Sequence, residues 1–219
     1  MAFHFGGRIV RDGLVLHIDP ADRNSYIGSG TTVNDLSGNG NTGTLRNGLG
    51  FSSDNQGVFI LDGNDRIDLG TDASITLSQA ITVSAWVRPT SYNTLSGIVN
   101  YGNGGYWLYL ATTGELHGYI RDAGFTSSQV VPLNIFSNVA ITYDKQNVNL
   151  YFNGIEVSSS PYTLDIATYL SHQLYIGSIK LVAERHFIGN IGQVLIYNKA
   201  LSEEDLITNF NCTKSRYGL

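Results

Sequence analysis

The stretch that most constrains the fold is residues 187–210, which read F-I-G-N-I-G-Q-V-L-I-Y-N-K-A-L-S-E-E-D-L-I-T-N-F. Within it, Val194 and Ile196 alternate with Leu195 and Tyr197, which is the period of a β-strand. The alternation predicts a strand whose Ile196 side chain faces the protein interior.

The same stretch then changes from the period of a strand to that of a helix. Ser202 stands where a helix N-cap belongs, and residues 203–205 are acidic, as the positive end of a helix dipole favours. Leu206, Ile207 and Phe210 form one apolar stripe. These residues predict a short helix over residues 203–210, directly after the strand.

The remainder of the chain carries strand signals and little else. They fall at residues 14–18, 58–61, 66–69, 81–87, 98–100, 106–110, 116–121, 139–143, 148–152 and 173–176. Asn153-Gly154 and Asp62-Gly63 each predict a two-residue hairpin turn, and residues 102–105 predict a longer one. About a dozen short strands with one helix predict two packed antiparallel sheets.

Composition limits the classes of function. The chain has 219 residues, a net charge of −5 and 42% apolar residues, which suit one domain with a full core. No basic run suggests nucleic-acid binding, and no apolar run is long enough for membrane insertion. The single Cys212 cannot form an internal disulfide, and the start lacks the pattern of a secretory signal. We therefore expect synthesis in a reducing cytoplasm.

Several segments resemble a known family. I-T-V-S-A-W-V-R-P at 81–89, the pair N-V-A-I-T-Y-D and V-N-L-Y-F-N-G-I-E-V at 138–157, and G-V-F-I-L-D-G-N-D-R-I-D at 57–68 occur in the family's order. With the strand and helix at the end, they resemble the laminin-G-like, concanavalin A-like family. The resemblance implies an all-β, two-sheet antiparallel jelly-roll sandwich with one short C-terminal helix. It covers residues 13–210, leaving an arm at 1–12 and a tail at 211–219.

The opening segment resembles a narrower group. I-V-R-D-G-L-V-L-H-I-D-P-A-D-R-N-S-Y at 9–26 and G-S-G-T-T-V-N-D-L-S-G-N-G-N-T-G-T-L at 28–45 are similar to the start of lectin-like proteins of tailed-phage virions. This resemblance implies a virion structural module, such as a capsid decoration or a neck or tail component. Such a module is made in the host cytoplasm and contacts other virion proteins or copies of itself.

The sequence argues against catalysis. Hydrolases of this fold carry E-x-D-x-E on one strand, which places the acid and the nucleophile on one face. None of the five glutamates forms that pattern. We therefore expect no enzyme activity, and a glycoside hydrolase is a remote alternative.

No cofactor or metal is predicted. Calcium prefers six to eight oxygen ligands from convergent loops. Asp62, Asp65 and Asp144 could meet in space and hold one calcium ion, which we keep as an alternative.

Aromatic residues suggest where a sugar could bind. In the run Y-W-L-Y-L, Trp107 and Tyr109 share one strand face. With Tyr119 and Asn103 nearby, they could form a platform for a glycan, because sugars bind flat aromatic faces beside amide and carboxylate groups. The other interpretation is that these rings only cover the sandwich. A carbohydrate-binding adhesin or lectin for cell-surface glycan is accordingly the alternative function.

The two ends carry apolar and aromatic side chains of the kind found in interfaces. Phe3, Phe5 and Ile9 lie in the arm, and Arg216 and Tyr217 lie in the tail. We expect these residues to be assembly contacts with a neighbouring subunit. The competing interpretation is that both ends fold back onto their own domain.

Overall fold

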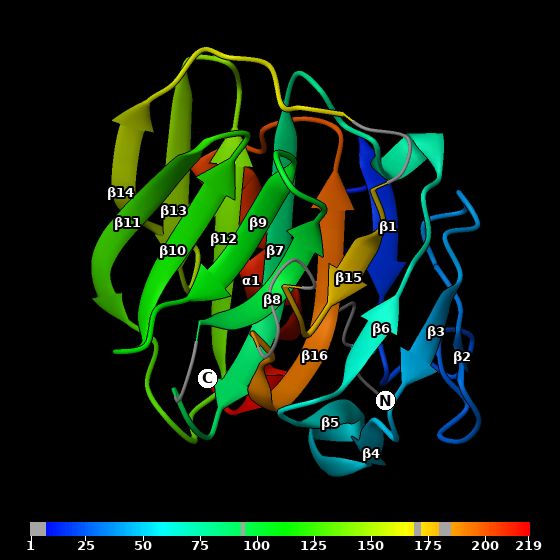
Figure 1. Ribbon diagram of the computed structural model, residues 1–219. Helices are drawn as coiled ribbons and strands as arrows, with labels where there is room; N and C mark the ends of the chain where they lie inside the picture. Colours follow the sequence, from blue (N-terminus) through cyan, green and yellow to red (C-terminus); the bar gives the residue numbers. More distant parts are fainter. Residues whose placement is uncertain (1–7, 93–94, 169–171, 180–184) are drawn as a thin grey trace.

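The computed structural model describes residues 8–92, 95–168, 172–179 and 185–219. Two antiparallel sheets lie face to face, with one helix behind the first sheet (Figure 1). This is the predicted jelly-roll sandwich. No helix in the described ranges has the length and apolar character needed to cross a membrane.

The first sheet has the strand order β14-β13-β12-β7-β16-β5-β4, and β1 also pairs with β16. Its strands are β1 (Leu14–Ile18), β4 (Gly50–Ser52), β5 (Val58–Asp62), β7 (Ile81–Pro89), β12 (Ser137–Tyr143), β13 (Asn147–Phe152), β14 (Ile155–Pro161) and β16 (Ile188–Tyr197).

The second sheet has the order β11-β10-β9-β8-β15-β6-β3-β2 and lies in front in Figure 1. Its strands are β2 (Thr32–Val33), β3 (Gly43–Arg46), β6 (Arg66–Asp68), β8 (Ser96–Tyr101), β9 (Tyr106–Leu110), β10 (Glu115–Ile120), β11 (Ala123–Val130) and β15 (Leu174–Ile176). Within the described residues, the helices are α1 (Glu203–Thr213) and three 3-10 turns, η1 (Asp54–Gln56), η2 (Ala73–Ile75) and η3 (Lys214–Tyr217).

The core lies between the two sheets and is built by alternation along each strand. Ile196 is fully buried there, as predicted, together with Val194. Leu195 and Tyr197 point the other way, yet they are buried too, because α1 covers the outer face of the first sheet. Both faces of β16 are therefore buried, which explains why its residues 194–197 are all large and apolar or aromatic.

The predicted turns have mixed outcomes. Asn153-Gly154 closes the β13–β14 hairpin with φ of 53° and 83°, the left-handed conformations that such a turn needs. Residues 102–105 join β8 to β9, as expected. The Asp62-Gly63 prediction is wrong, because β5 and β6 belong to different sheets and this connection crosses between them.

Residues 24–47, which show little periodicity in the sequence, contain the two short strands β2 and β3. Both add to the outer edge of the second sheet beyond β6. Only Val33 and Leu45 supply apolar side chains to the core from these strands, which is too few to reveal a strand pattern.

The helix begins as predicted and ends later. The Ser202 hydroxyl accepts a bond from the Asp205 N–H at 3.2 Å, and the Asp205 carboxylate accepts one from the Ser202 N–H at 3.4 Å. This reciprocal capping box fixes the first turn. The helix runs to Thr213, and η3 follows, so residues 211–217 are part of the folded domain rather than a tail.

Candidate functional site

The outer face of the second sheet carries the aromatic side chains singled out in the sequence. Trp107 on β9 and Tyr119 on β10 are cross-strand partners, and their rings stack at 4.1 Å with an angle of 16° between the planes. Tyr109 meets the Trp107 ring edge-on at 6.4 Å. Tyr106, Leu108 and Leu110 alternate with them and fill the core, which is why these rings point outward.

The rings of this group differ in accessibility. Trp107 is only 9% exposed, and its indole N–H donates to the Gly102 carbonyl at 2.6 Å. Tyr119 is partly exposed and leans on Trp107. Trp107 therefore packs against one face of Tyr119. Tyr109 is partly exposed as well, so Tyr109 and Tyr119 are the two rings of this group that a ligand can reach.

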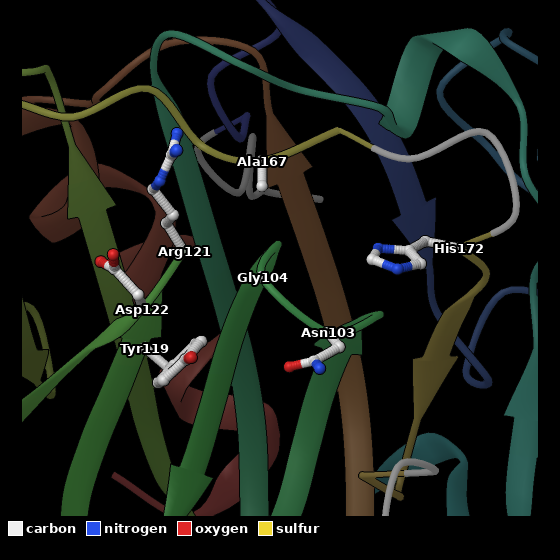
Figure 2. A pocket seen from close by; sticks show the side chains of 7 residues that line it. All are labelled: Asn103, Gly104, Tyr119, Arg121, Asp122, Ala167 and His172. Atoms are coloured by element: carbon white, nitrogen blue, oxygen red, sulfur yellow. The ribbon is translucent and has the colours of Figure 1, made fainter.

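A hollow of about 570 Å³ opens beside Tyr119 at the loop end of the second sheet (Figure 2). Three segments line it. The β8–β9 tip supplies Asn103 and Gly104, the β10–β11 turn supplies Arg121 and Asp122, and the chain after β14 supplies Ala167 and His172. The structure thus brings Asn103 and Tyr119 to one site, while Tyr109 lies outside its lining.

Backbone bonds hold these segments together. The Arg121 N–H donates to the Gly105 carbonyl at 2.8 Å, and the Ala167 N–H donates to the Gly104 carbonyl at 3.1 Å. Gly102 has a φ of 53°, and a Cβ there would lie 2.1 Å from the ring of His172. The tip therefore needs glycine at this position for His172 to pack over it.

The polar groups of the hollow are oriented by their neighbours. The Tyr162 hydroxyl donates to the Asp122 carboxylate at 2.7 Å, and burial together with that bond raises the pKa of Tyr162 to about 12. The hydroxyl therefore remains a donor at neutral pH. Arg121 donates to the Asp165 carbonyl at 3.2 Å, and burial lowers the pKa of His172 below its usual range.

Chemically, the hollow offers one carboxylate, one guanidinium, one amide, one imidazole and one tyrosine ring. These are the groups that orient polyhydroxylated ligands. Among the described lining residues, Asp122 is the single carboxylate. Hydrolysis by an acid and a nucleophile or base requires two carboxyl groups about 5–9.5 Å apart.

Sequence reasoning missed Arg121, Asp122 and His172. The Arg121-Asp122 pair is a two-residue hairpin turn between Ile120 and Ala123. Its signal is weak because β11 reads A-G-F-T-S-S-Q-V, in which Phe125 is the one large apolar residue that faces inward.

The alternative of a calcium ion finds no support in the geometry. Within the part of the chain that the structure describes, no three acidic, His or Cys side chains are grouped to hold a metal ion, so Asp62, Asp65 and Asp144 do not meet. The Asp144 carboxylate instead accepts bonds from the N–H groups of Gln146 and Asn147.

The predicted assembly contacts lie elsewhere. Tyr217 stacks on Trp86 within the domain, and Arg216 forms a 2.9 Å ion pair with Asp19 in which both side chains are about nine-tenths buried. Ile9 packs against the cluster around Leu206. These three side chains are therefore used inside the domain, which corrects the expectation for them, and Phe3 and Phe5 lie outside the described residues.

Comparison with known proteins places the chain among relatives. A family model described as the Concanavalin A-like lectin/glucanases superfamily matches residues 61–207, about two thirds of the chain. The chain belongs to this superfamily. The resemblance noted in the sequence is confirmed at that level. No curated protein sequence matches the chain.

Solved structures share the superfamily fold. Domain 4 of AbnA, an extracellular arabinanase of Geobacillus stearothermophilus in complex with arabinotriose, has a TM-score of 0.71 and 20% identity, and the match covers 90% of this chain and 98% of that domain. The binding domain of Paraclostridial Mosquitocidal Protein 1 has a TM-score of 0.73 and 20% identity over 91% of this chain and 52% of that one. The binding domain of Botulinum Neurotoxin DC in complex with SialylT has a TM-score of 0.71 and 15% identity, and the match covers 92% of this chain and 51% of that one. This chain spans about half the length of the two toxin domains.

Proposed function

We propose that this chain is a non-catalytic glycan-binding module that holds a sugar in the hollow beside Tyr119. The observation that carries the proposal is the meeting of a supported aromatic ring with Asn103, Arg121 and Asp122 around a space of about 570 Å³. An aromatic ring contacts the apolar face of a sugar, and the polar groups bind its hydroxyls.

The AbnA domain gives the proposal additional support, because that domain shares the fold along nearly its whole length and is in complex with arabinotriose. The absence of a second carboxylate among the described lining residues favours binding without hydrolysis.

The test is a glycan array probed with the purified protein, followed by a reducing-sugar assay on every glycan that binds. We expect binding to a restricted set of glycans and no release of reducing ends. Hydrolysis that tracks the purified protein and disappears in Asp122→Asn would overturn the non-catalytic part. The absence of binding to any glycan would overturn the binding part.

The finer proposal is that the module is a structural component of a tailed-phage virion, made in the host cytoplasm and attached to other virion proteins. It rests on the resemblance of residues 9–26 and 28–45 to such proteins. A lectin fold displayed on a particle would help that particle attach to a cell-surface glycan. The protein should then co-purify with particles at a fixed copy number, and its loss on density-gradient purification would contradict this role.

A further inference from the structure

Four asparagines in the chain are followed directly by glycine, and they are Asn39, Asn47, Asn103 and Asn153. Asparagine is a chemically labile residue, and a following glycine adds to the lability, because it has no side chain to shield its main-chain nitrogen from the asparagine amide. Whether that nitrogen reaches the amide carbon in a folded protein depends on what holds the two groups. Three of the four side chains are held by hydrogen bonds, and the fourth is Asn103.

The three held amides have partners in the fold. The Asn39 amide donates to the Ser37 hydroxyl at 3.0 Å, and the Asn47 amide donates to a main-chain carbonyl at 2.7 Å. The Asn153 amide oxygen accepts the Asn138 N–H at 2.8 Å. Each of these amides must break a bond before it can turn back onto the following glycine, so folding protects all three.

Asn103 is exposed at the β8–β9 tip, and its amide extends into the hollow (Figure 2). Within the described ranges, neither this amide nor the N–H of Gly104 takes part in a hydrogen bond. Bonds hold the tip on both sides, since the Gly102 carbonyl accepts the Trp107 indole N–H at 2.6 Å and the Gly104 carbonyl accepts the Ala167 N–H at 3.1 Å. The loop is thus in place, while the two groups that would react are unbonded.

We propose that Asn103 is a site of spontaneous deamidation, which converts its amide into a carboxylate. The Gly104 nitrogen attacks the Asn103 Cγ, the new C–N bond closes a succinimide ring, and ammonia leaves. Water then opens the ring. Opening at Cγ yields aspartate, and opening at the main-chain carbonyl yields isoaspartate, whose main chain runs through Cβ and Cγ. In sum, the amide and one water become a carboxylate and an ammonium ion.

The product changes the hollow in two ways. A carboxylate replaces an amide that both donates and accepts hydrogen bonds, and it adds a negative charge to a lining that already contains Asp122. Isoaspartate also inserts one more main-chain carbon between the Gly102 and Gly104 carbonyls, which Trp107 and Ala167 hold in place. We therefore expect the modification to weaken glycan binding, and this consequence rests on the proposed function.

The test ages the full chain at mildly alkaline pH, which favours attack by the main-chain nitrogen, both in the native state and in urea. Peptide mapping by mass spectrometry follows the conversion of all four asparagines. Asn103→Gln is the matched control, because glutamine keeps the amide but must close a larger ring, and Asn103→Asp represents the product. Calorimetry then compares fresh and aged samples with a glycan that the fresh wild-type chain binds.

In the native chain we expect Asn103 to convert at least tenfold faster than each of the other three asparagines. In urea the four rates should lie within threefold of one another, since the protecting bonds are gone. Aged wild type and fresh Asn103→Asp should bind the glycan at least tenfold more weakly than fresh wild type, whereas Asn103→Gln should bind equally before and after ageing.

Equal rates at all four asparagines in the native chain would overturn the assignment of Asn103 as the modification site. Full binding by Asn103→Asp and by the aged chain would overturn the effect on the hollow. If the fresh wild-type chain binds no glycan, the proposed function fails, and the peptide map still decides the modification.

Discussion

The Tyr217 ring stacks on the Trp86 ring at 4.2 Å, which attaches the end of the chain to the outer face of the first sheet. The Tyr217 hydroxyl also accepts the Gln193 N–H at 3.0 Å, and Gly192 leaves room for it, since a Cβ there would lie 2.2 Å from that oxygen. The segment η3 therefore completes a small second core behind the sandwich.

Replacing Tyr217 should consequently destabilise the domain. Removing a buried aromatic side chain costs about 3–5 kcal/mol, and we expect Tyr217→Ala to lower the free energy of unfolding by that amount. Urea denaturation would measure it, with Leu219→Ala as the control because Leu219 is 47% exposed. Equal stability of the two variants would show that η3 does not hold the fold.

Deleting residues 214–219 should have a similar effect for a second reason. The deletion removes Arg216 and leaves the Asp19 carboxylate without the guanidinium that faces it, and an uncompensated buried charge costs about 3–5 kcal/mol. We expect the truncated protein to be unfolded or to melt far below the full chain in circular dichroism. A truncated protein that melts normally but no longer assembles would restore the expectation that this end is a docking element.

Stability should also fall at mildly acidic pH because of His17. Its side chain is buried beside Gln193 and Asp19, and burial lowers the pKa of His17 below its usual range, although Asp19 acts in the opposite direction. The contribution of neutral His17 is therefore present above the unfolded-state pKa of about 6.5 and is lost as the pH falls through the folded-state value. The melting temperature of the wild-type chain should exceed that of His17→Gln at pH 7.5, and the difference should shrink toward pH 4.5. A constant difference would contradict this assignment.

Arg121 gives a prediction that separates binding from stability. Its φ is 57°, a left-handed conformation that costs a non-glycine residue about 1–2 kcal/mol. Glycine would relieve that strain in the folded state. It also raises the conformational entropy of the unfolded chain, which lowers the free energy of unfolding by about 0.4–1 kcal/mol. We expect Arg121→Gly to change stability by less than about 1 kcal/mol and to weaken glycan binding at least tenfold. Gln56→Gly, at an exposed position with a φ of 68°, is the control that should leave binding unchanged.

The sequence correctly predicts the elements whose structure depends mainly on residues close together in the chain. These elements are the strand β16, the N-terminal cap of α1 and the Asn153-Gly154 turn. The structure has each of them where the local sequence pattern predicts it. Trp86 lies in the segment 81–89 that resembles the family and is buried, but its partners Phe210 and Tyr217 lie more than 120 positions away. No local signal identifies such partners, which is why the sequence predicts assembly contacts at this end and leaves packing against the chain's own domain as the competing interpretation.

The candidate site also divides into residues that a local pattern predicts and residues that it does not. Alternation predicts that Trp107 and Tyr109 share one face, with Tyr119 nearby, and in the structure the three rings lie together. Arg121, Asp122 and His172 could not be found, because the hairpin that presents two of them ends in the weakly patterned strand β11. The preference for Tyr119 over Tyr109 depends on which loops surround each ring, which only the assembled sheet determines.

The measurement that tests the central claim most directly is a calorimetric titration of a glycan that binds the wild-type chain into Tyr119→Ala and Tyr109→Ala. Both residues lie beside Trp107 on the same outer face, but only Tyr119 lines the hollow. Once thermal melting has shown that both variants are folded, we expect Tyr119→Ala to lose at least tenfold in affinity, about 1.4 kcal/mol, and Tyr109→Ala to bind within threefold of the wild type. Undiminished binding by Tyr119→Ala would contradict the assignment of this hollow as the glycan site.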